Sequence, residues 1–288
     1  MDGVKRFDGK SLSTECAAAA ADGRHQRSTG PGTCGVAIMA KASAPGRTKT
    51  RLVPPLTFDE AAALNTAFLR DIADNLMLAA RHAAIAGYTA YAPPGSEGFF
   101  RRVLPPAIGL IDAWLPDFGD CLFRTIQEIF TRGHGSAVVL NSDSPTLPTA
   151  FLVETADMLA RPGERAVLGP SSDGGYYLLG LKTAHRRLFE DIAWSTECVA
   201  AQTLERARDI GLDVHMLPVW YDVDDIEGLR RLAGEVSRPR SSARARDAHE
   251  PHHPAETAAL MHRLWADGEF ARRREDFRQI ESAAAGAA

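Results

Sequence analysis

From about residue 35 to residue 232, short apolar runs alternate with longer segments in which apolar residues recur every three to four positions. Short apolar runs predict buried strands, and amphipathic segments predict helices. The predicted strands cover residues 35–40, 88–92, 108–115, 137–141, 166–168, 175–181 and 213–217. The predicted helices cover residues 57–81, 119–132, 148–159, 196–210 and 225–232. This alternation is typical of a single-domain α/β fold, with a mostly parallel sheet flanked by helices.

Two local signals mark the ends of predicted helices. Thr57 and Glu60 have the spacing of a capping box, which predicts that a helix begins there. Gly211 follows the predicted helix over 196–210, where a C-cap glycine belongs.

The two ends of the chain lack this alternation. Residues 1–33 are polar and rich in Ala, Gly and Ser, which predicts a disordered N-terminal extension. The folded domain is expected over residues 34–236, and a linker rich in Arg, Ser, Pro and His over 237–254. Residues 255–288 are expected to hold one C-terminal helix, over about 256–280, and a tail. This helix either packs back on the domain or pairs with a second subunit in a homodimer.

The composition excludes several classes of protein. The chain has 288 residues, of which 45% are hydrophobic and 24% charged, enough for one large domain with a substantial core. The net charge of −4 gives no nucleic-acid signature, and no apolar run approaches the roughly 20 residues of a membrane span. The cysteines form no C-x-x-C pair, which fits a cytoplasmic protein without a disulfide framework or zinc site. They are Cys16, Cys34, Cys121 and Cys198.

A carboxylate stands just after a predicted buried strand. The apolar run over 137–140 leads into N-S-D-S-P-T-L-P at 141–148, which contains Asp143. In open α/β sheets ligands bind outside the carboxyl ends of the strands, and a carboxylate there can hold a divalent cation against a phosphate. The alternative is that Asp143 makes an Asx-turn or helps to cap the next helix.

The first predicted strand runs into a loop with four cations in eleven positions, which we call the basic loop (residues 41–51). Its cations are Lys41, Arg47, Lys49 and Arg51. A cationic loop at the carboxyl end of a strand can hold phosphate groups. The alternative is a solvated basic turn; the spacing of a Walker A loop is absent.

A third segment, residues 169–181, combines a carboxylate with paired glycines. Asp173 could serve as a base or contact a substrate hydroxyl, and Gly174 and Gly175 let a backbone approach a ligand closely. Asp-Gly is also a strong turn signal, so a hairpin is expected here in either case. Because side chains alternate along a strand, one of Tyr176 and Tyr177 is expected in the core and the other towards a cleft.

A fourth segment, residues 220–229, follows the last predicted strand. Alternation puts Asp222 and Asp224 on one side, where one of them could complete a cation site with Asp143. The alternative is that Asp224 or Asp225 only caps the following helix. A weaker signal is Trp194 before Ser195: Ser195 is a natural N-cap, and Trp194 is either core or a pocket wall.

With these segments in order, the chain resembles the DUF2064 family of GT-A-like proteins, often labelled glycosyltransferases and including an arsenosugar-biosynthesis group. The family pattern is a loop of the form A-K-x-P-x-x-G-x-x-K-T-R-L, then G-S-D-S-P-T-L-P, then D-G-G-Y-Y-L-x-G-L, then Y-D-V-D before a helix. The match covers about residues 35–232. The family is in turn similar to molybdenum-cofactor and phospholactate guanylyltransferases.

The resemblance implies a GT-A fold, a nucleotide bound over the basic loop and a divalent metal, Mg²⁺ or Mn²⁺. It maps the four loop cations to phosphate binding, and Asp143 and Asp224, with Asp222 less firmly placed, to the metal. There are two departures from the pattern. Asn141 stands where Gly is common, and Cys121 stands where the family has Arg, which puts in doubt any phosphate or acceptor contact of that arginine.

Three functions remain open from the sequence. The first is a Mg²⁺-dependent GT-A transferase that moves a glycosyl group from a nucleotide-diphospho-sugar to a small-molecule acceptor. Asp173 would then act on the acceptor side, with Gly174, Gly175, Tyr176, Trp194 and Ser195 shaping the substrate site. The second is a nucleotidyltransferase that joins an NTP to a phosphorylated small molecule, since a dense cation loop suits a triphosphate. The third is a non-catalytic nucleotide-binding protein. No nucleic-acid or membrane partner is expected.

Overall fold

A seven-stranded sheet in the order β3-β2-β1-β4-β6-β5-β7 organises the computed structural model, which describes residues 29–237 and 249–285. The strands are β1 (Cys34–Lys41), β2 (Ile85–Ala92), β3 (Gly109–Asp112), β4 (Ser136–Leu140), β5 (Ala166–Pro170), β6 (Tyr176–Leu181) and β7 (Val214–Met216). All neighbours are parallel except β6, which runs antiparallel to both β4 and β5. The expected single-domain α/β fold with a mostly parallel sheet is confirmed, and each predicted strand is present.

The Asp-Gly turn explains the antiparallel strand. Residues 171–175 join β5 directly to β6, so the expected hairpin forms. Gly174 takes a left-handed conformation in it (φ +88°), which favours glycine.

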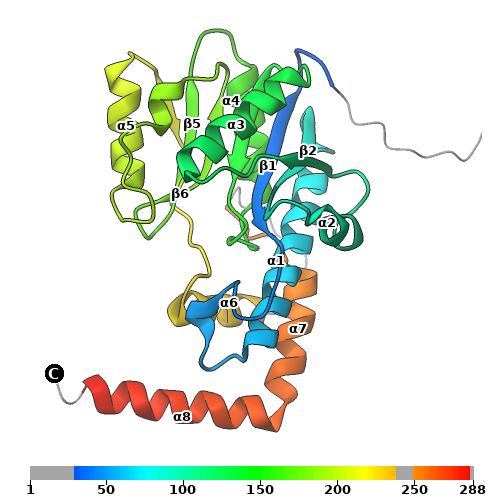
Figure 1. Cartoon of the computed structure of the whole chain (residues 1–288), viewed down its shortest axis with the longest axis vertical. Helices are drawn as coiled ribbons and strands as arrows, with labels where there is room; N and C mark the ends of the chain where they lie inside the picture. The colour runs from blue at the N-terminus through cyan, green and yellow to red at the C-terminus, as the bar shows by residue number, and fades with distance from the viewer. Residues whose placement is uncertain (1–28, 238–248, 286–288) are drawn as a thin grey trace, which may run out of the picture.

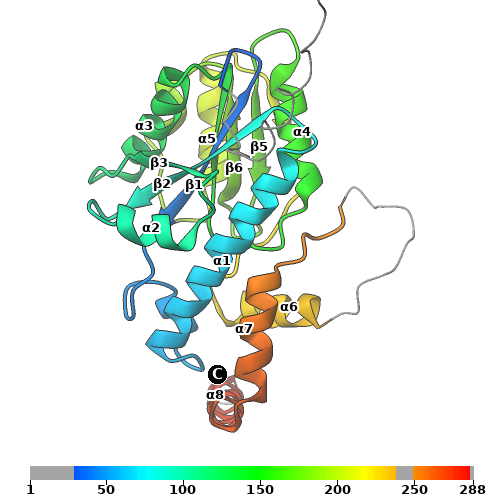
Figure 2. The ribbon, with the colours of Figure 1, turned by 90° about the vertical axis from the view of Figure 1, so that its right-hand side faces the viewer.

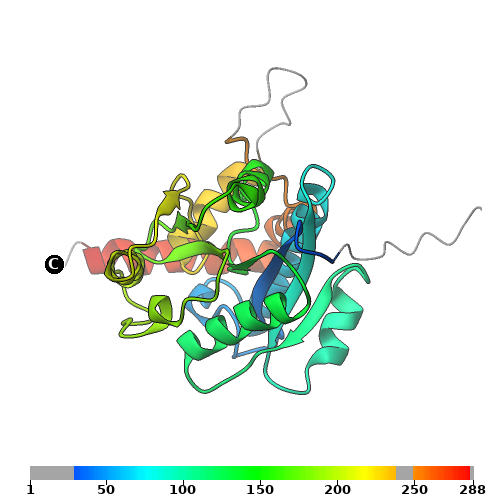
Figure 3. The same cartoon turned by 90° about the horizontal axis from the view of Figure 1, so that it is seen from above.

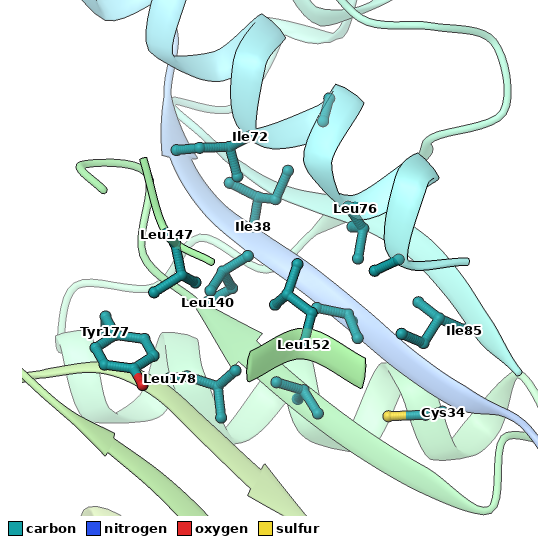
Figure 4. Close-up of a cluster of buried hydrophobic side chains, with 14 of the residues drawn as sticks. Cys34, Ile38, Ile72, Leu76, Ile85, Leu140, Leu147, Leu152, Tyr177 and Leu178 are labelled. Carbon is teal, nitrogen blue, oxygen red and sulfur yellow. The ribbon is translucent and has the colours of Figure 1, made fainter. Parts of the chain in front are cut away.

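Helices cover both faces of the sheet (Figure 2, Figure 3). Apolar side chains from α1 (Phe58–Ala79) and α4 (Thr149–Ala160) pack on one face, and those from α3 (Phe118–Thr131) and α5 (Val199–Asp209) pack on the other. Figure 4 shows the core on the side of α1 and α4, where Ile72 and Leu76 of α1 meet Ile38 and Leu140 of the central strands. The capping box at Thr57 and Glu60 is formed, and Gly211 ends α5 with φ +64°, as expected.

One helix was not predicted from the sequence. Helix α2 (Glu97–Val103) has only seven residues, too few for a clear apolar period. It is held by Phe100, which is fully buried and packs against Tyr91 at the end of β2.

The C-terminal segment is two helices rather than the single helix expected over 256–280. Helix α7 (Ala255–Ala266) ends at Asp267, whose backbone is extended and whose carboxylate accepts a hydrogen bond from Glu269 N. Helix α8 (Gly268–Ala285) then runs in a new direction beneath α6 (Ile226–Val236) (Figure 1). The sequence does carry a turn signal here, Asp267 followed by Gly268, but the expected helix over 256–280 ran through it.

The sequence left open whether this segment packs on the domain or on a second subunit. In the structure, α7 packs on the domain. It packs along α1, and the buried carboxylate of Asp71 caps it by accepting hydrogen bonds from Glu256 N (2.9 Å) and Thr257 N (2.8 Å). Burial raises the pKa of Asp71 to about 6. Pairing of this segment with a second chain stays a prediction.

The boundary of the folded part lies earlier than expected. Thr33 is buried, donates a hydrogen bond to Gly30 O and bonds His134, so residues 30–33 pack on the domain. The rest of the predicted extension (1–28), most of the predicted linker (238–248) and the last three residues (286–288) lie outside the described residues. Among the helices that the structure describes, none combines the length and apolar character needed to cross a membrane.

Candidate functional site

A cleft of about 1020 Å³ opens at the carboxyl ends of the central strands. Its walls come from the ends of β1, β2 and β4, the basic loop, the turn before β6 and the segment that precedes α5. In Figure 1 this edge of the sheet points down, towards α6. The cleft therefore lies where open α/β sheets bind ligands, as expected from Asp143.

The centre of the site is the ammonium group of Lys49. Its Nζ lies 2.5 Å from Oδ1 of Asp143 and 2.8 Å from Oδ1 of Asp224, and it also donates a hydrogen bond to Val223 O. The Lys49 side chain is only 5% exposed, and its ammonium lies 5.2 Å from the centre of the Phe68 ring of α1. The structure thus brings Asp143 and Asp224 together, as expected, around a buried cation.

Lys49 does not lie on a loose turn. Its backbone is left-handed (φ 51°), which is uncommon for a residue other than glycine and persists only where the surroundings hold it. The bonds of Nζ supply that restraint, and the short 3₁₀ helix Thr50–Leu52 follows at once and buries Leu52. The alternative of a solvated basic turn does not hold for Lys49, whose side chain is buried.

The other cations of the basic loop are exposed. Arg51 bonds Oδ2 of Asp224 at 2.7 Å while 71% of its side chain remains exposed. Lys41 and Arg47 are exposed residues that line the cleft. The four cations therefore share one cleft, and two of them are paired with its carboxylates.

The charges in the cluster shift one another's protonation. Burial alone would lower the pKa of the Lys49 ammonium, but Asp143 and Asp224 outweigh it and raise that pKa. Burial would raise the pKa of Asp224, but Lys49 and Arg51 hold it below its ordinary value. Burial and the neighbouring charges of Asp173, Asp224 and Asp143 raise the pKa of Asp222 to about 6. Asp222 neither pairs with Lys49 nor lines the cleft.

Hydrogen bonds between two distant segments create this convergence. Val223 N donates to Asp143 O (2.8 Å), and the Ser144 hydroxyl donates to Tyr221 O (2.9 Å). Tyr221 and Val223 are buried, which leaves the side chains between and after them to face the other way, as alternation predicted. Asp225 caps α6 by accepting a hydrogen bond from Gly228 N. The neighbouring Asp224 is therefore left to pair with Lys49.

The carboxylate arrangement fits a divalent cation that also takes oxygens from a substrate. Asp143 and Asp224 direct oxygens at one cation position, where the Lys49 ammonium stands. Among the described residues, no set of three or more His, Cys, Asp and Glu side chains is arranged to hold a metal by itself. Mg²⁺ is commonly bound by one or two carboxylates together with substrate phosphates, and a pair of carboxylates matches that donor set. Asp222 does not complete a preformed three-carboxylate set.

The turn before β6 places one carboxylate in the cleft. Asp173 is exposed, lines the cleft and accepts a hydrogen bond from Gly175 N at 2.9 Å. Gly175 also lines the cleft, but Gly174 does not. A Cβ on Gly174 would lie 2.0 Å from Glu197 O, so this glycine is needed for packing rather than for a substrate.

The two tyrosines divide as alternation predicted. Tyr177 is 1% exposed, packs against Phe151 and donates a hydrogen bond to Pro218 O. Tyr176 points to the other face of the sheet, packs against the core beneath α3 and lines the cleft.

Trp194 and Ser195 both line the cleft, but Ser195 does not cap a helix. Helix α5 begins only at Val199, and Ser195 has φ 64° in the turn before it. The Trp194 ring meets the Phe118 ring edge to face, with centroids 5.3 Å apart and planes at 85°.

On the aromatic side of the cleft, sequence reasoning singled out Trp194 but missed Trp114 and Phe118. Trp114 is 46% exposed and Phe118 is 50% exposed, and both line the cleft. Cys121 also lines it, and its thiol is bonded to both N and O of Leu115, which fixes the segment that carries Trp114. Trp114 fell within an apolar run that was attributed to a strand, although β3 ends at Asp112.

The chain is similar to one protein family and to several solved structures. A family model described as "Uncharacterized protein conserved in bacteria (DUF2064)" matches residues 75–196. A solved structure from Desulfovibrio desulfuricans G20, provisionally named a nucleotide-diphospho-sugar transferase, is 27% identical with a TM-score of 0.69 and covers 83% of this chain and 97% of that one. A comparison with curated proteins gives no match.

Two further solved structures overlap more loosely. A cytidylyltransferase from Leptospira borgpetersenii is 11% identical with a TM-score of 0.47, covering 83% of this chain and 96% of that one. The 4-diphosphocytidyl-2C-methyl-D-erythritol synthase of Anaerococcus prevotii is 11% identical with a TM-score of 0.46, covering 72% and 97%. The fold expected from the resemblance is therefore confirmed by the Desulfovibrio structure, and the resemblance to the DUF2064 family is confirmed by the family model over residues 75–196.

Proposed function

We propose that this chain is a Mg²⁺-dependent GT-A transferase that moves a glycosyl group from a nucleotide-diphospho-sugar to a small-molecule acceptor. The observation that carries the proposal is the convergence of Asp143 and Asp224 on one cation position at the carboxyl edge of the sheet. The provisional name of the Desulfovibrio protein, which aligns over most of both chains, supports the same class of donor.

The basic loop would hold the diphosphate of the donor. Lys41, Arg47 and Arg51 are exposed cations along one wall of the cleft, and charge-assisted hydrogen bonds from such groups to phosphate are strong. Asp143 and Asp224 would hold the cation, which supplies positive charge against the negative charge on the leaving nucleoside diphosphate. The Lys49 ammonium stands between these carboxylates, so it would give way to the metal and then bind phosphate itself.

Asp173 would act on the acceptor. In glycosyl transfer an acceptor hydroxyl oxygen forms a bond to the anomeric carbon while the bond from that carbon to the phosphate oxygen breaks. The hydroxyl proton passes to a base, and the nucleoside diphosphate leaves. Asp173 is an exposed carboxylate in the cleft near the charge cluster, so it is placed to accept that proton.

Nucleotidyl transfer is the second candidate, because four cations in one loop also suit a triphosphate and a pyrophosphate leaving group. In that reaction a phosphorylated acceptor attacks the α-phosphate of an NTP and pyrophosphate leaves. The same carboxylate pair would hold the cation, so the metal cannot separate the two candidates.

A thermal-shift panel of NTPs and nucleotide-diphospho-sugars, with and without Mg²⁺, tests the proposal. We expect a sugar nucleotide to raise Tm by several degrees in Mg²⁺, with little effect when Mg²⁺ is replaced by EDTA. The variant Asp143→Asn should lose the Mg²⁺-dependent part. The matched control Asp157→Asn, on the exposed side of α4, should keep it. Stabilisation by NTPs alone would favour nucleotidyl transfer, and stabilisation by neither class would overturn both candidates.

A further inference from the structure

The two sides of the cleft differ in chemistry. Every Lys and Arg that lines the cleft, within the described part of the chain, belongs to the basic loop. This loop lies on the α1 side, since the Lys49 ammonium contacts the Phe68 ring of that helix. Cationic recognition of phosphate is therefore confined to one side.

The opposite side, beneath α3 and α5, is aromatic. Trp114, Phe118 and Trp194 line it, and the first two leave about half of their surface exposed, at 46% and 50%. Exposed large aromatic side chains that gather at a cleft mark a binding surface more often than a stability device. The charged residues on this side are Asp173 and Glu197, both carboxylates and both exposed.

One polar group on this side lacks a partner within the protein. The hydroxyl of Tyr176 is buried and forms no hydrogen bond to any residue that the structure describes. Leaving a hydroxyl buried and unpaired costs about 1–3 kcal/mol, so such groups commonly have a partner outside the chain. Oδ1 of Asn141, on the neighbouring strand end, is also buried without a partner and also lines the cleft.

We infer that this aromatic side binds the acceptor, and that the acceptor is an uncharged, hydroxyl-bearing ring compound such as a sugar or a glycoside. Aromatic rings pack against the apolar face of such a ring, while Tyr176 and Asn141 supply hydrogen bonds to its hydroxyls. Asp173 and Glu197 accept hydrogen bonds from hydroxyls and repel a phosphate. The buried thiol of Cys121 is engaged with Leu115.

This inference rests on the proposed glycosyl transfer and narrows it. A phosphorylated acceptor would need a cation on the acceptor side, which the lining residues there do not supply. The geometry therefore favours glycosyl transfer to a neutral acceptor over nucleotidyl transfer to a phosphate.

The test uses two matched probes, 4-nitrophenyl β-D-glucopyranoside and its 6-phosphate, titrated against the full chain by saturation-transfer difference NMR. We expect the neutral glycoside to bind at least about fivefold more tightly than the phosphate, a difference of about 1 kcal/mol. Trp114→Ala and Phe118→Ala should each weaken glycoside binding about three- to tenfold. Phe58→Ala is the matched control, because Phe58 is also 50% exposed but does not line the cleft.

Tyr176→Phe separates binding from folding. If the hydroxyl waits for an acceptor, its removal weakens glycoside binding while Tm stays the same or rises, because an unpaired buried group is removed. A purely structural tyrosine would lower Tm and leave glycoside binding unchanged. Glu197→Gln should reduce the difference in affinity between the neutral glycoside and its 6-phosphate, because it removes a negative charge.

The inference is overturned if the 6-phosphate binds as tightly as the glycoside, if neither probe binds, or if the aromatic variants bind like the native chain. The nucleotide panel on the same samples distinguishes the two levels of failure. If sugar nucleotides stabilise the chain but the acceptor results fail, only the acceptor assignment is lost. If sugar nucleotides do not bind, the proposed function itself fails.

Discussion

The two ends of the central strands each bury a cluster of polar side chains, and the clusters have opposite character. At the amino end, His134 bonds the hydroxyls of Thr33 (2.6 Å) and Tyr88 (2.7 Å) through its two ring nitrogens. At the carboxyl end, Lys49 is held between Asp143 and Asp224. The first cluster is neutral and closed on itself, whereas the second is charged and opens into the cleft.

The difference shows how a structural cluster can be told from a functional one. In the amino-end cluster both nitrogens of His134 are paired within the protein, and the side chain does not line the cleft. In the carboxyl-end cluster, Asp143 and Asp224 keep about a third of their side-chain surface exposed, at 29% and 33%, beside a large cleft. Carboxylates that remain accessible can exchange the Lys49 ammonium for a metal ion. A hydrogen-bond chain whose members are all paired within the protein can only stabilise the fold.

The largest effect is expected from Lys49→Ala. The substitution leaves Asp143 and Asp224 close together without the cation between them, and it also removes the hydrogen bond to Val223 O. Breaking a buried pair costs several kcal/mol, and partial exposure of the carboxylates reduces this to about 2–4 kcal/mol. Urea unfolding measures the change, and Mg²⁺ should restore part of the loss by taking the vacated position.

Arg51→Ala is the matched control for that variant. Because 71% of the Arg51 side chain is exposed, stability should change by less than about 0.5 kcal/mol, while nucleotide affinity falls roughly tenfold. Equal destabilisation by the two variants would contradict the distinction between a buried and an exposed cation. The sequence maps both residues to phosphate binding, and the structure distinguishes them by burial, because the Lys49 side chain is buried between two carboxylates and that of Arg51 is not.

The sequence could predict the site in part because its motifs lie at strand ends. A strand followed by Asp143, and a strand followed by Asp222 and Asp224, both deliver carboxylates to the carboxyl edge of a parallel sheet. What it could not predict is the depth of Lys49, since burial there depends on Phe68 and on the pairing of Val223 with Asp143, contacts distant along the chain. Cation-rich loops look alike in sequence whether or not they are buried.

The next effect concerns the amino-end cluster. His134→Leu leaves the Tyr88 hydroxyl buried without its partner, which should lower the free energy of unfolding by about 2 kcal/mol. Nucleotide binding should not change, because the cluster lies at the opposite edge from the cleft. The double variant with Tyr88→Phe should recover part of the loss, since it removes the orphaned hydroxyl. Loss of nucleotide binding in a folded His134→Leu chain would break the contrast between the clusters.

The same cluster explains why the boundary of the folded part was misplaced. Residues 29–33 carry little apolar character, so the sequence pattern placed them in the extension. Their role is polar and close-packed: Thr33 bonds His134, and a Cβ on Gly135 would lie 1.8 Å from Pro31 O. The periodicity of apolar residues reveals apolar faces but does not reveal polar contacts of this kind.

Truncation gives a smaller, sharper test of that boundary. A chain that begins at Thr29 should be more stable than one that begins at Cys34 by about 1–2 kcal/mol. The shorter chain loses the Thr33 bond to His134 and the hydrogen bond from Gly135 N to Thr33 O. Unfolding of both in urea measures the difference. Equal stability would show that residues 29–33 contribute nothing and would restore the boundary expected from the sequence.

The smallest expected effect is a pH dependence of the free energy of unfolding that arises from His134 in the amino-end cluster. Burial and, to a lesser degree, the positive charge of Arg132 lower the pKa of His134 below its ordinary value of 6.5. In the pH range just below 6.5 the unfolded chain therefore binds a proton that the folded chain refuses, so this histidine makes stability fall as the pH falls through that range.

His134→Leu cannot take up this proton, which makes it the internal reference. The free energy of unfolding of the native chain and of the variant should be measured at pH 7.5 and at pH 5.5. Because all other titrating groups are shared, their contributions cancel, and the advantage of the native chain over His134→Leu should be smaller at pH 5.5. An advantage that stays constant or grows on acidification would mean that the folded state accepts the proton. The cluster would then be open to charge, and the contrast with the Lys49 cluster would be lost.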